Sequence, residues 1–409
     1  MTTRRVAVTG MSGITALGSD WPTIRAAFAE GRTGIRVMEG WDRFGGINTR
    51  LGAPVEGFSV EDRFPRKKTR TMGRVAQLAV CACEQALDDA GLRDDPVVRN
   101  GRTGIAYGSS FGSPDSVLGF YELKKDGESR HLNATSYIRM MSHTAAVNIG
   151  LFFGATGRII PTSSACTSGS QAIGYAYEAI AWNKADVMIA GGAEELDITD
   201  TAVFDTLYAT STKNDSPATT PRPFDRDRDG LVIGEGAGTL ILEELDHARA
   251  RGATIYAEVV GFGCNSDGNH VTQPQAETMA GALRLALDDA GLSPDAIGFV
   301  SGHGTATEGG DIAETTATHA VLGDKAPIHS LKGHFGHSLG ACGAIEAWLA
   351  IAMMREGLFV PTANLHTVDP RCGALDYLKG EPRRLDIGYL MSNNFAFGGI
   401  NTSLIFRRV

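Results

Sequence analysis

Ala-Leu-Asp-Asp-Ala-Gly-Leu occurs twice in this sequence, at Ala86–Leu92 and again at Ala286–Leu292. In both copies the heptad ends a helical pattern, with glycine at the position just past a helix where left-handed residues are common. A linker and an apolar segment of the buried-strand type follow each copy, Thr103–Tyr107 in one and Ala296–Val300 in the other. Each segment then enters a polar, glycine-rich stretch. Seven matching residues can arise by chance, but this matching context indicates an internal duplication.

Strands and helices alternate along the whole chain, which favours an α/β protein with mostly parallel central strands. No segment is typical of a flexible linker, so we expect two halves, residues 1–250 and 251–409, to pack as one body. Near the end, Tyr389–Met391 and Thr402–Phe406 predict two strands around the glycine turn in Phe395–Gly399.

Composition excludes several classes of protein. The 409 residues carry 38 basic and 47 acidic side chains, a net charge of −9 that does not favour nucleic-acid binding. One segment, Arg63–Arg74, is nevertheless basic, and fits either a solvated helix start or a docking site for an acidic partner. Glycine accounts for 51 residues, which indicates tight turns and close backbone packing.

The cysteines and the apolar segments indicate the cellular compartment in which the protein works. The six cysteines have neither CxxC pairs nor zinc spacing, so we expect no metal site. The N-terminal residues run directly into a strand, and the longest uncharged stretch, Ile159–Tyr177, is rich in Ser, Thr and Gly. We therefore expect a cytoplasmic protein without a membrane span.

Cys166 is the candidate nucleophile. It lies in Pro161–Ser170, between an extended segment and residues whose apolar positions recur at helical spacing. At a helix N-terminus the dipole favours thiolate over thiol, and the free N–H groups can hold an oxyanion. Most isolated cysteines are simply small buried apolar residues, so position alone leaves both interpretations open.

Two histidines favour the functional interpretation. His303 stands at the carboxyl end of a predicted strand, and His337 stands just before an apolar helix. Through the duplication, that helix start is the counterpart of the one at Cys166. Because ligands bind beyond the carboxyl ends of strands in open α/β sheets, we expect the three side chains to meet in one crevice.

Three other motifs carry less weight. Gly336–Gly340 matches the G-x-S-x-G elbow of α/β-hydrolases, but no good strand precedes it and the required order of the triad fails. Val8–Gly13 and the pair Tyr121 and Lys125 lack the rest of a dinucleotide-binding pattern. His334 and His337 have no third metal ligand at useful spacing.

Five motifs together resemble one family. They are SSACTSGS around Cys166, TPRPFDRDRDGLVIGEGAG at Thr220–Gly238, GHGTATEGGDIAE at Gly302–Glu314, LKGHFGHSLGACGAIE at Leu331–Glu346, and NNFAFGGIN at Asn393–Asn401. In this order they resemble the elongating β-ketoacyl-acyl-carrier-protein synthases over nearly the whole chain. The resemblance implies a thiolase-like α/β fold, with duplicated αβα halves packed as a five-layer αβαβα body. It also implies decarboxylative condensation of malonyl-acyl-carrier protein with an acyl group on the cysteine, in fatty acid or polyketide and polyene synthesis.

The same resemblance implies roles for individual residues. Cys166 would be the nucleophile, His303 and His337 would assist malonyl decarboxylation, and Lys332 would orient the site. The backbone N–H groups of Cys166 and Phe397 would form the oxyanion hole. The remaining implied residues fall into four groups: the gate (Ala396, Phe397, Gly398), substrate contacts (Thr305, Thr307, Thr272, Phe395, Phe111), supporting residues (Asp311, Glu314, Glu346, Asn401) and carrier-protein docking (Lys67, Lys68, Arg70, Lys213). No metal, flavin or nucleotide cofactor would be required.

Three departures from the family pattern concern the substrate. Ala396 replaces a glycine of the gate and narrows its backbone freedom. Asn269 stands where an aromatic residue is common on the companion loop. Phe111 falls where a smaller aliphatic residue often lines the acyl tunnel. We therefore predict that Phe111 shortens or redirects this tunnel and favours shorter, flatter or unsaturated chains, as in a specialised polyene ketosynthase.

The resemblance also implies partners. It predicts an acyl-carrier protein and a homodimer, to which apolar segments such as Ile149–Gly157 could contribute. The alternative is a heterodimer with a chain-length-factor-like subunit. An inactive subunit of that kind typically lacks the nucleophile, so the intact Cys166, His303 and His337 favour an active chain. A degradative thiolase would carry a different Cys–His arrangement.

Overall fold

The central sheet contains one order of five strands, used twice, and one additional strand at an edge. The computed structural model describes residues 3–409, and its main sheet has eleven strands. From edge to edge these are β13 (Asp376–Tyr377), β11 (Pro327–His329), β10 (Ile297–Ser301), β15 (Tyr389–Ala396), β16 (Ile400–Arg407), β9 (Ala257–Ser266), β1 (Val6–Ile14), β8 (Gly236–Glu244), β6 (Val187–Glu194), β4 (Thr103–Gly108) and β5 (Ile159–Thr162).

The repeat is visible in the sheet order. Strands β5-β4-β6-β8-β1 follow the chain order third, second, fourth, fifth, first, and β11-β10-β15-β16-β9 follow the same order. In each half the first three of these strands pair in parallel, and the two remaining pairings, third with fourth and fourth with fifth in the order given, are antiparallel. The sheet is therefore mixed rather than mostly parallel. The halves join where Val6–Val8 of β1 pairs with Ala257–Val259 of β9. This topology confirms the duplicated fold, while a domain boundary at residue 250 remains a prediction.

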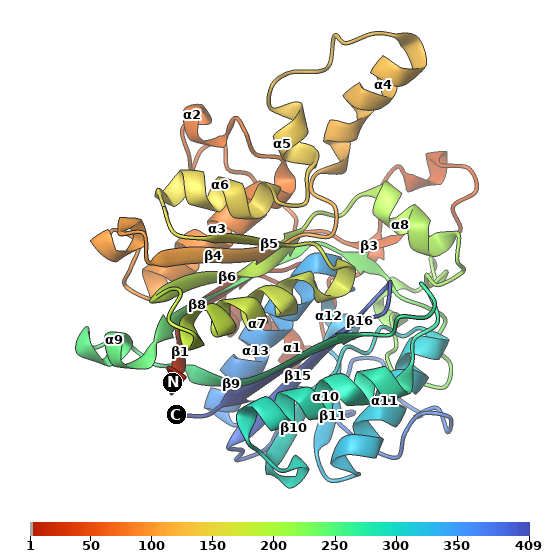
Figure 1. Ribbon diagram of the computed structural model, residues 1–409. Helices are drawn as coiled ribbons and strands as arrows, with labels where there is room; N and C mark the ends of the chain where they lie inside the picture. Colours follow the sequence, from red (N-terminus) through yellow and green to blue (C-terminus); the bar gives the residue numbers. More distant parts are fainter. Residues whose placement is uncertain (1–2) are drawn as a thin grey trace.

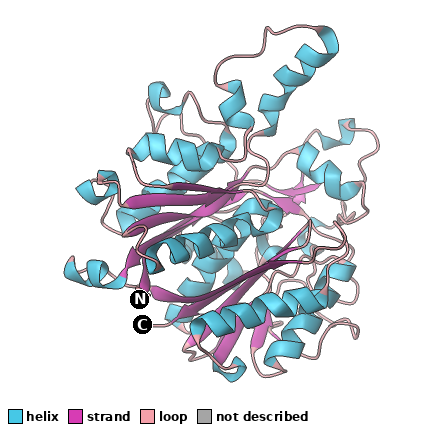
Figure 2. Ribbon diagram, in the orientation of Figure 1, coloured by secondary structure: helices cyan, strands magenta, loops and turns pink. Residues whose placement is uncertain are grey.

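Helices cover both halves of the sheet and fill the space between them (Figures 1 and 2). The outer layers are α3 (Arg74–Asp89) with α6 (Thr144–Phe153) and α10 (Ala276–Ala290) with α11 (Glu308–Leu322); the middle layer is α7 (Ser168–Ala181) with α13 (Cys342–Glu356). Every residue of α13 up to Met354 is buried, as expected for a helix that is apolar all round and packed between two sheets. The layers therefore follow the predicted order αβαβα.

Several local predictions are confirmed. The two heptads end α3 and α10, and Gly91 and Gly291 adopt left-handed φ values of +67° and +63°. Strands β4 and β10 follow these helices. Strands β15 and β16 enclose a turn in which Gly398 and Gly399 also have positive φ.

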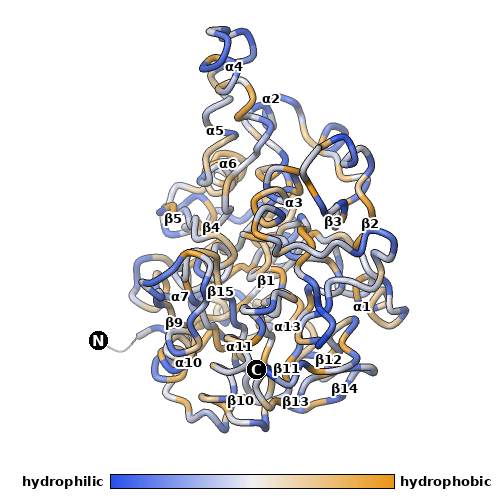
Figure 3. The backbone as a smooth tube through the Cα atoms, turned by 90° about the vertical axis from the view of Figure 1, so that its right-hand side faces the viewer, coloured by the Kyte–Doolittle hydropathy of each residue, from blue (hydrophilic) through white to orange (hydrophobic). Residues whose placement is uncertain are grey.

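The remaining elements lie around this core: α1 (Trp21–Ala29), α2 (Arg66–Thr69), α4 (Leu118–Asp126), α5 (Ser136–Met140), α8 (Ile198–Asp205), α9 (Leu245–Ala250), α12 (Lys332–Phe335), β2 (Arg36–Val37), β3 (Leu51–Ala53), β7 (Ile233–Gly234), β12 (Leu358–Phe359) and β14 (Arg383–Arg384). The segment with α4 and α5 extends away from the five layers, and its tip is hydrophilic (Figure 3). Over residues 3–409, no helix combines the length and apolarity needed to cross a membrane.

Candidate active site

Cys166 lies in the turn Ala165–Thr167, which leads directly into α7. Ala165 has φ +50°, a strained conformation for a residue with a side chain, and the thiol is 4% exposed. Burial raises the pKa of the Cys166 thiol to about 11, against the opposing effects of the Phe397 backbone N–H and the Lys332 ammonium. Burial of the sulfur therefore opposes the thiolate form that the helix N-terminus is predicted to favour.

His337 lies beside this thiol. It follows α12 and precedes α13, and its Nε2 is 3.1 Å from Sγ of Cys166. Burial lowers the pKa of His337 well below the usual value, and the nearby Lys332 charge lowers it further. Its other ring nitrogen, Nδ1, is buried with no hydrogen-bond partner among residues 3–409. The imidazole is thus neutral. The Cys166 thiol can donate to Nε2 or accept from it, and Nδ1 has no partner among the described residues, so the neighbours of His337 do not select one tautomer.

His303 follows β10 and has a fixed tautomer. Its Nδ1 lies 3.1 Å from Nζ of Lys332 and 3.2 Å from Nδ2 of Asn394, and both neighbours are donors. Nδ1 must therefore accept, and the proton resides on Nε2. This Nε2 is buried and has no partner within the part of the chain that the structure describes. The pKa of His303 is lowered by burial and by Lys332, so the ring presents one neutral N–H to the site.

Lys332 begins α12 and is 0% exposed. Besides its contact with Nδ1 of His303, its ammonium donates to the backbone oxygen of His303 at 2.6 Å and to Oε1 of Glu346 at 2.5 Å. Burial lowers the pKa of Lys332, but Glu346, Cys342 and Glu314 together raise it above its usual value, so the ammonium remains charged. Asn394 donates to the other oxygen of Glu346 at 2.7 Å. These contacts fix the ammonium at one place against His303.

Glu314 supports the loop that carries His303. From α11 its carboxylate accepts from the backbone N–H groups of His303, at 2.5 Å, and Gly304, at 2.6 Å. These bonds hold the backbone just past β10, and therefore the direction in which the His303 ring leaves it.

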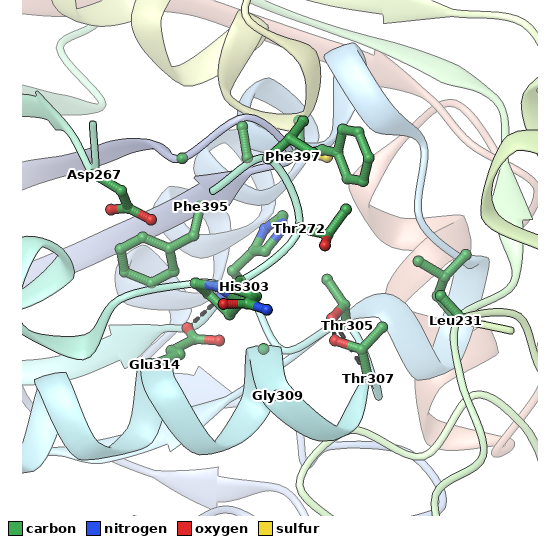
Figure 4. A pocket seen from close by; sticks show the side chains of 18 of the residues that line it. Leu231, Asp267, Thr272, His303, Thr305, Thr307, Gly309, Glu314, Phe395 and Phe397 are labelled. Atoms are coloured by element: carbon green, nitrogen blue, oxygen red, sulfur yellow. Dashed lines mark hydrogen bonds between the residues drawn. The ribbon is translucent and has the colours of Figure 1, made fainter. Parts of the chain in front are cut away.

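Thr305 and Thr307 are held by a second carboxylate. Asp311 accepts from the backbone N–H groups of Thr305, at 3.0 Å, and Ala306, at 3.1 Å, which keeps Ala306 at φ +66°. In this turn the hydroxyls of Thr305 and Thr307 lie 2.8 Å apart on one side of the cavity (Figure 4). Arg228, 2% exposed, lies 3.4 Å from Asp311 and donates to the backbone oxygen of Thr307. Arg228 is a supporting residue of the site that the sequence pattern did not predict.

A cavity of about 300 Å³ opens above these groups. Cys166, His303 and His337 lie in its wall, and Figure 4 shows Phe395 and Phe397 on the side opposite Thr305 and Thr307. Of the predicted substrate, gate and supporting residues, those in the wall are Thr272, Thr305, Thr307, Glu314, Phe395, Ala396, Phe397 and Asn401. Phe111 is not among the wall residues, and 44% of its surface is exposed. In the single chain, therefore, Phe111 does not narrow this cavity.

The turn after β15 closes one side of the cavity. The Phe397 ring packs edge-on against Phe204, with centroids 5.8 Å apart. The Gly398 N–H donates to the backbone oxygen of Val271 at 2.9 Å, which joins this turn to the loop after β9. Asn401 donates to Asp267 of that loop at 2.8 Å. Hydrogen bonds thus join the two loops into one unit at the mouth of the cavity.

The predicted docking residues differ in their availability. Lys67, Lys68 and Arg70 are exposed on and just after α2, as a solvated helix start would also be. Lys213 donates to the backbone oxygen of Asp227 at 3.2 Å and lies 3.5 Å from the Asp229 carboxylate. Part of its charge is therefore already neutralised within the chain.

The hydrolase alternative fails on local structure. Ser338 of the G-x-S-x-G match follows helix α12 instead of a strand, and it is 1% exposed. Its hydroxyl has no hydrogen-bond partner among the described residues, 3–409, so no histidine activates it.

Comparison with known proteins identifies the chain. Residues 3–248 match the family model for the Beta-ketoacyl synthase N-terminal domain, and residues 256–366 match the model for the C-terminal domain. The chain belongs to the β-ketoacyl synthase family. It is 37% identical to 3-oxoacyl-[acyl-carrier-protein] synthase 2 of Vibrio cholerae, over the full length of both chains. This ketosynthase is accordingly a condensing enzyme of the acyltransferase class.

Solved structures give the same result. A beta-ketoacyl synthase from Burkholderia phymatum aligns with a TM-score of 0.98 and 59% identity, covering 99% of this ketosynthase and 100% of that chain. The ishigamide ketosynthase/chain length factor aligns at 0.91, and a type II polyketide ketosynthase in complex with its acyl-carrier protein (AntDE:AntF) aligns at 0.89. Each of these two is 30% identical, and each match covers both chains completely. The thiolase-like fold is therefore confirmed.

Proposed function

We propose that this ketosynthase holds an acyl chain as a thioester on Cys166 and condenses it with a malonyl unit on acyl-carrier protein, giving a 3-oxoacyl product. One observation carries the proposal: Sγ of Cys166 and ring nitrogens of His303 and His337 lie within 4.8 Å of one another in the cavity wall. A nucleophile and two neutral imidazoles are the groups that acyl transfer and enolate stabilisation require.

In the first step, the chain is loaded. Sγ attacks the carbonyl of the acyl thioester while His337 takes the thiol proton on Nε2. The oxyanion faces the backbone N–H groups of Cys166 and Phe397, both of which already lower the thiol pKa. Collapse breaks the bond to the carrier thiol, which leaves with the proton from His337. Because no neighbour holds the His337 tautomer, Nε2 can accept here and donate later.

In the second step, the malonyl unit loses CO₂. The carbon–carbon bond breaks, and its electron pair forms an enolate whose oxygen accepts from Nε2–H of His303 and of His337. The enolate carbon then attacks the acyl carbonyl, and the bond to Cys166 breaks. The released thiolate takes a proton from solvent. Lys332 and Asn394 serve this step by keeping the His303 proton on Nε2.

We also propose that side chains and backbone suffice for these steps, without a metal, flavin or nucleotide cofactor. The substrates would arrive on the phosphopantetheine arm of the carrier, with Thr305 and Thr307 along its path. We place the enzyme in the cytoplasm, where the six cysteines, all free within residues 3–409, would stay reduced.

The decisive experiment is intact-mass spectrometry. The protein is incubated with acyl-carrier proteins of graded chain length, and Cys166→Ala serves as the control. A mass increase equal to the acyl group, absent from the control and discharged by malonyl-acyl-carrier protein, is the expected result. An adduct that persists in Cys166→Ala would overturn the assignment of the nucleophile.

The proposed carrier contact is the exposed basic group on α2. Lys67, Lys68 and Arg70 carry positive charge in a chain whose net charge is −9, so they would steer an acidic carrier to this face. The neighbour solved with its acyl-carrier protein supports a partner of this kind.

The proposed assembly is a homodimer. Strand β5 lies at the edge of the main sheet, with Ile159 41% exposed, and Leu151 on the adjacent helix α6 is 68% exposed. A bare edge with apolar side chains is normally covered, here by a second copy. The ishigamide neighbour favours the alternative, a heterodimer with a chain-length-factor-like subunit. Light scattering of the purified chain distinguishes them, since a monomer would favour the heterodimer.

A further inference from the structure

Two sets of side chains in the active site have the donor types of a zinc site. In one set the ligand atoms come from Cys166, His303 and His337, and in the other from His303, Cys342 and Glu346. Within each set these atoms lie within 4.8 Å of one another, and all the residues are buried. Thiolate sulfur, imidazole nitrogen and carboxylate oxygen are the ligands that Zn²⁺ prefers. A zinc ion bound in the first set would block the nucleophile, Cys166.

The Lys332 ammonium already occupies the second set. Its Nζ lies 2.5 Å from Oε1 of Glu346, 3.1 Å from Nδ1 of His303 and 2.6 Å from the His303 backbone oxygen. These three acceptors surround the charge as ligands would surround a cation. A metal ion could enter only by displacing a fully buried ammonium from its carboxylate partner, which is costly without a replacement partner.

The first set is obstructed through the far side of the His303 ring. If Nε2 of His303 bound a metal, the ring proton would have to move to Nδ1. A metal-bound histidine almost always donates from its second nitrogen to a carboxylate, carbonyl or water. Here the neighbours of Nδ1 are Nζ of Lys332 and Nδ2 of Asn394, both of which are donors. The surroundings of His303 are therefore the reverse of those in a zinc site.

Charge acts in the same direction. The Lys332 ammonium lies close enough to lower the pKa of both His303 and His337, and the same field repels a dication near Cys166. Geometry and charge thus act through Lys332, and hydrogen bonding acts through Lys332 together with Asn394.

We propose that Lys332 keeps divalent metal ions out of this active site. Its ammonium occupies the cation position of one ligand set and, together with Asn394, prevents His303 from binding a metal in the other set. This role is separate from the catalytic role proposed above and does not depend on it, because it concerns binding of a metal to the free enzyme.

The test measures zinc binding in place of turnover. Wild-type protein, Lys332→Leu and the control Lys67→Leu are titrated with Zn²⁺ against a chromophoric chelator under reducing conditions. Leucine removes the ammonium without adding a metal ligand, and Lys67 is an exposed lysine on α2 that belongs to neither ligand set. We expect one zinc per chain in Lys332→Leu, with an affinity at least about 10- to 100-fold above wild type and above the control. Cys166→Ser or Cys342→Ser in the Lys332→Leu background then identifies the set that binds.

Two results would overturn the proposal: a zinc affinity of Lys332→Leu equal to that of wild type, or tight binding by wild type itself. Circular dichroism establishes that the variants are folded, since an unfolded chain could bind zinc through its cysteines. If the buried Glu346 carboxylate prevents Lys332→Leu from folding, the double variant Lys332→Leu/Glu346→Gln removes both charges and keeps the first set intact. The same gain in zinc affinity is expected from it.

Discussion

Nε2 of His337 lies 3.1 Å from Sγ of Cys166, yet burial raises the pKa of the thiol and lowers that of the imidazole. The two groups therefore form a neutral pair in the free enzyme instead of a thiolate–imidazolium ion pair. Proton transfer has to accompany attack on the acyl carbonyl, when the oxyanion hole is occupied. Such a site holds its nucleophile in an unreactive form until substrate arrives.

Alkylation of Cys166 by iodoacetamide tests this resting state. With a thiol pKa of about 11, the rate at Cys166 should rise about tenfold per pH unit from pH 7 to pH 10, because the thiolate fraction rises in that proportion. Mass spectrometry of wild type and Cys166→Ala isolates the contribution of this thiol. A rate that is already constant between pH 7 and pH 8 would show that Cys166 is a thiolate at rest.

Asn394→Asp tests the fixed tautomer of His303. The new carboxylate beside Nδ1 would accept a proton from it, so Nε2 would lose the hydrogen that the enolate needs. We expect malonyl decarboxylation to fall about 10²- to 10³-fold, while acyl loading of Cys166 is nearly unchanged. Asn394→Ser is the matched control, because its hydroxyl can still donate to Nδ1 and should cost less. Equal losses in loading and decarboxylation would contradict this division.

Ala396→Gly restores the glycine of the gate. Ala396, at the end of β15 and next to the turn through Gly398, packs against the buried cluster that includes Cys166. Glycine adds backbone freedom, so we expect the unfolding free energy to fall by about 0.5–1 kcal/mol and loading of Cys166 to become a few-fold faster. Thermal denaturation and rapid-quench loading measure the two effects. Slower loading would show that Ala396 does not restrain the gate.

Lys67→Glu and Lys68→Glu, made together, test the docking proposal. Reversing two exposed charges should raise KM for carrier-linked substrates at low salt and leave small thioester substrates unaffected. Lys213→Ala should have a weaker effect, because Asp229 already neutralises part of that charge. Steady-state assays at two salt concentrations give both comparisons. An equal loss with small thioesters would place the defect in the active site.

Phe111→Ala tests the predicted limit on chain length. Phe111 does not line the cavity of the single chain, so any such limit would have to act in the assembled dimer. If Phe111 limits the chain, the variant should load longer saturated acyl groups than wild type, with loading of short chains retained. Loading of graded acyl-carrier proteins, followed by mass, gives the profile. An unchanged profile would reject a role for Phe111 in the tunnel.

The site residues that could be predicted from the sequence are those that lie at the ends of strands or the starts of helices. Strand ends and helix starts located Cys166, His303 and His337, because the period of apolar residues shows where elements begin and end. The ionisation of Cys166 was not predictable, since it depends on how deeply the folded chain buries the sulfur. Asn394 was missed because its importance lies in facing Nδ1 of His303, a contact between residues 91 positions apart. Arg228 was missed because it stands among several charged neighbours in sequence, and only the fold shows that it is buried.

The repeated strand order also bears on how an asymmetric reaction came to be performed by a symmetric architecture. Helices α7 and α13 join the third and fourth strands of their respective halves, and a short turn precedes each helix, Ala165–Thr167 and Leu339–Ala341. Ala165 and Leu339 open these turns with similar positive φ values, so Gly340 is the residue that matches Cys166, and His337 lies just before the second turn. Two identical halves would carry the same residues in and around both turns. Fusion into one polypeptide lets each turn mutate independently. A duplication thus supplied two equivalent turns, and divergence placed the nucleophile within one turn and the proton carrier just before the other.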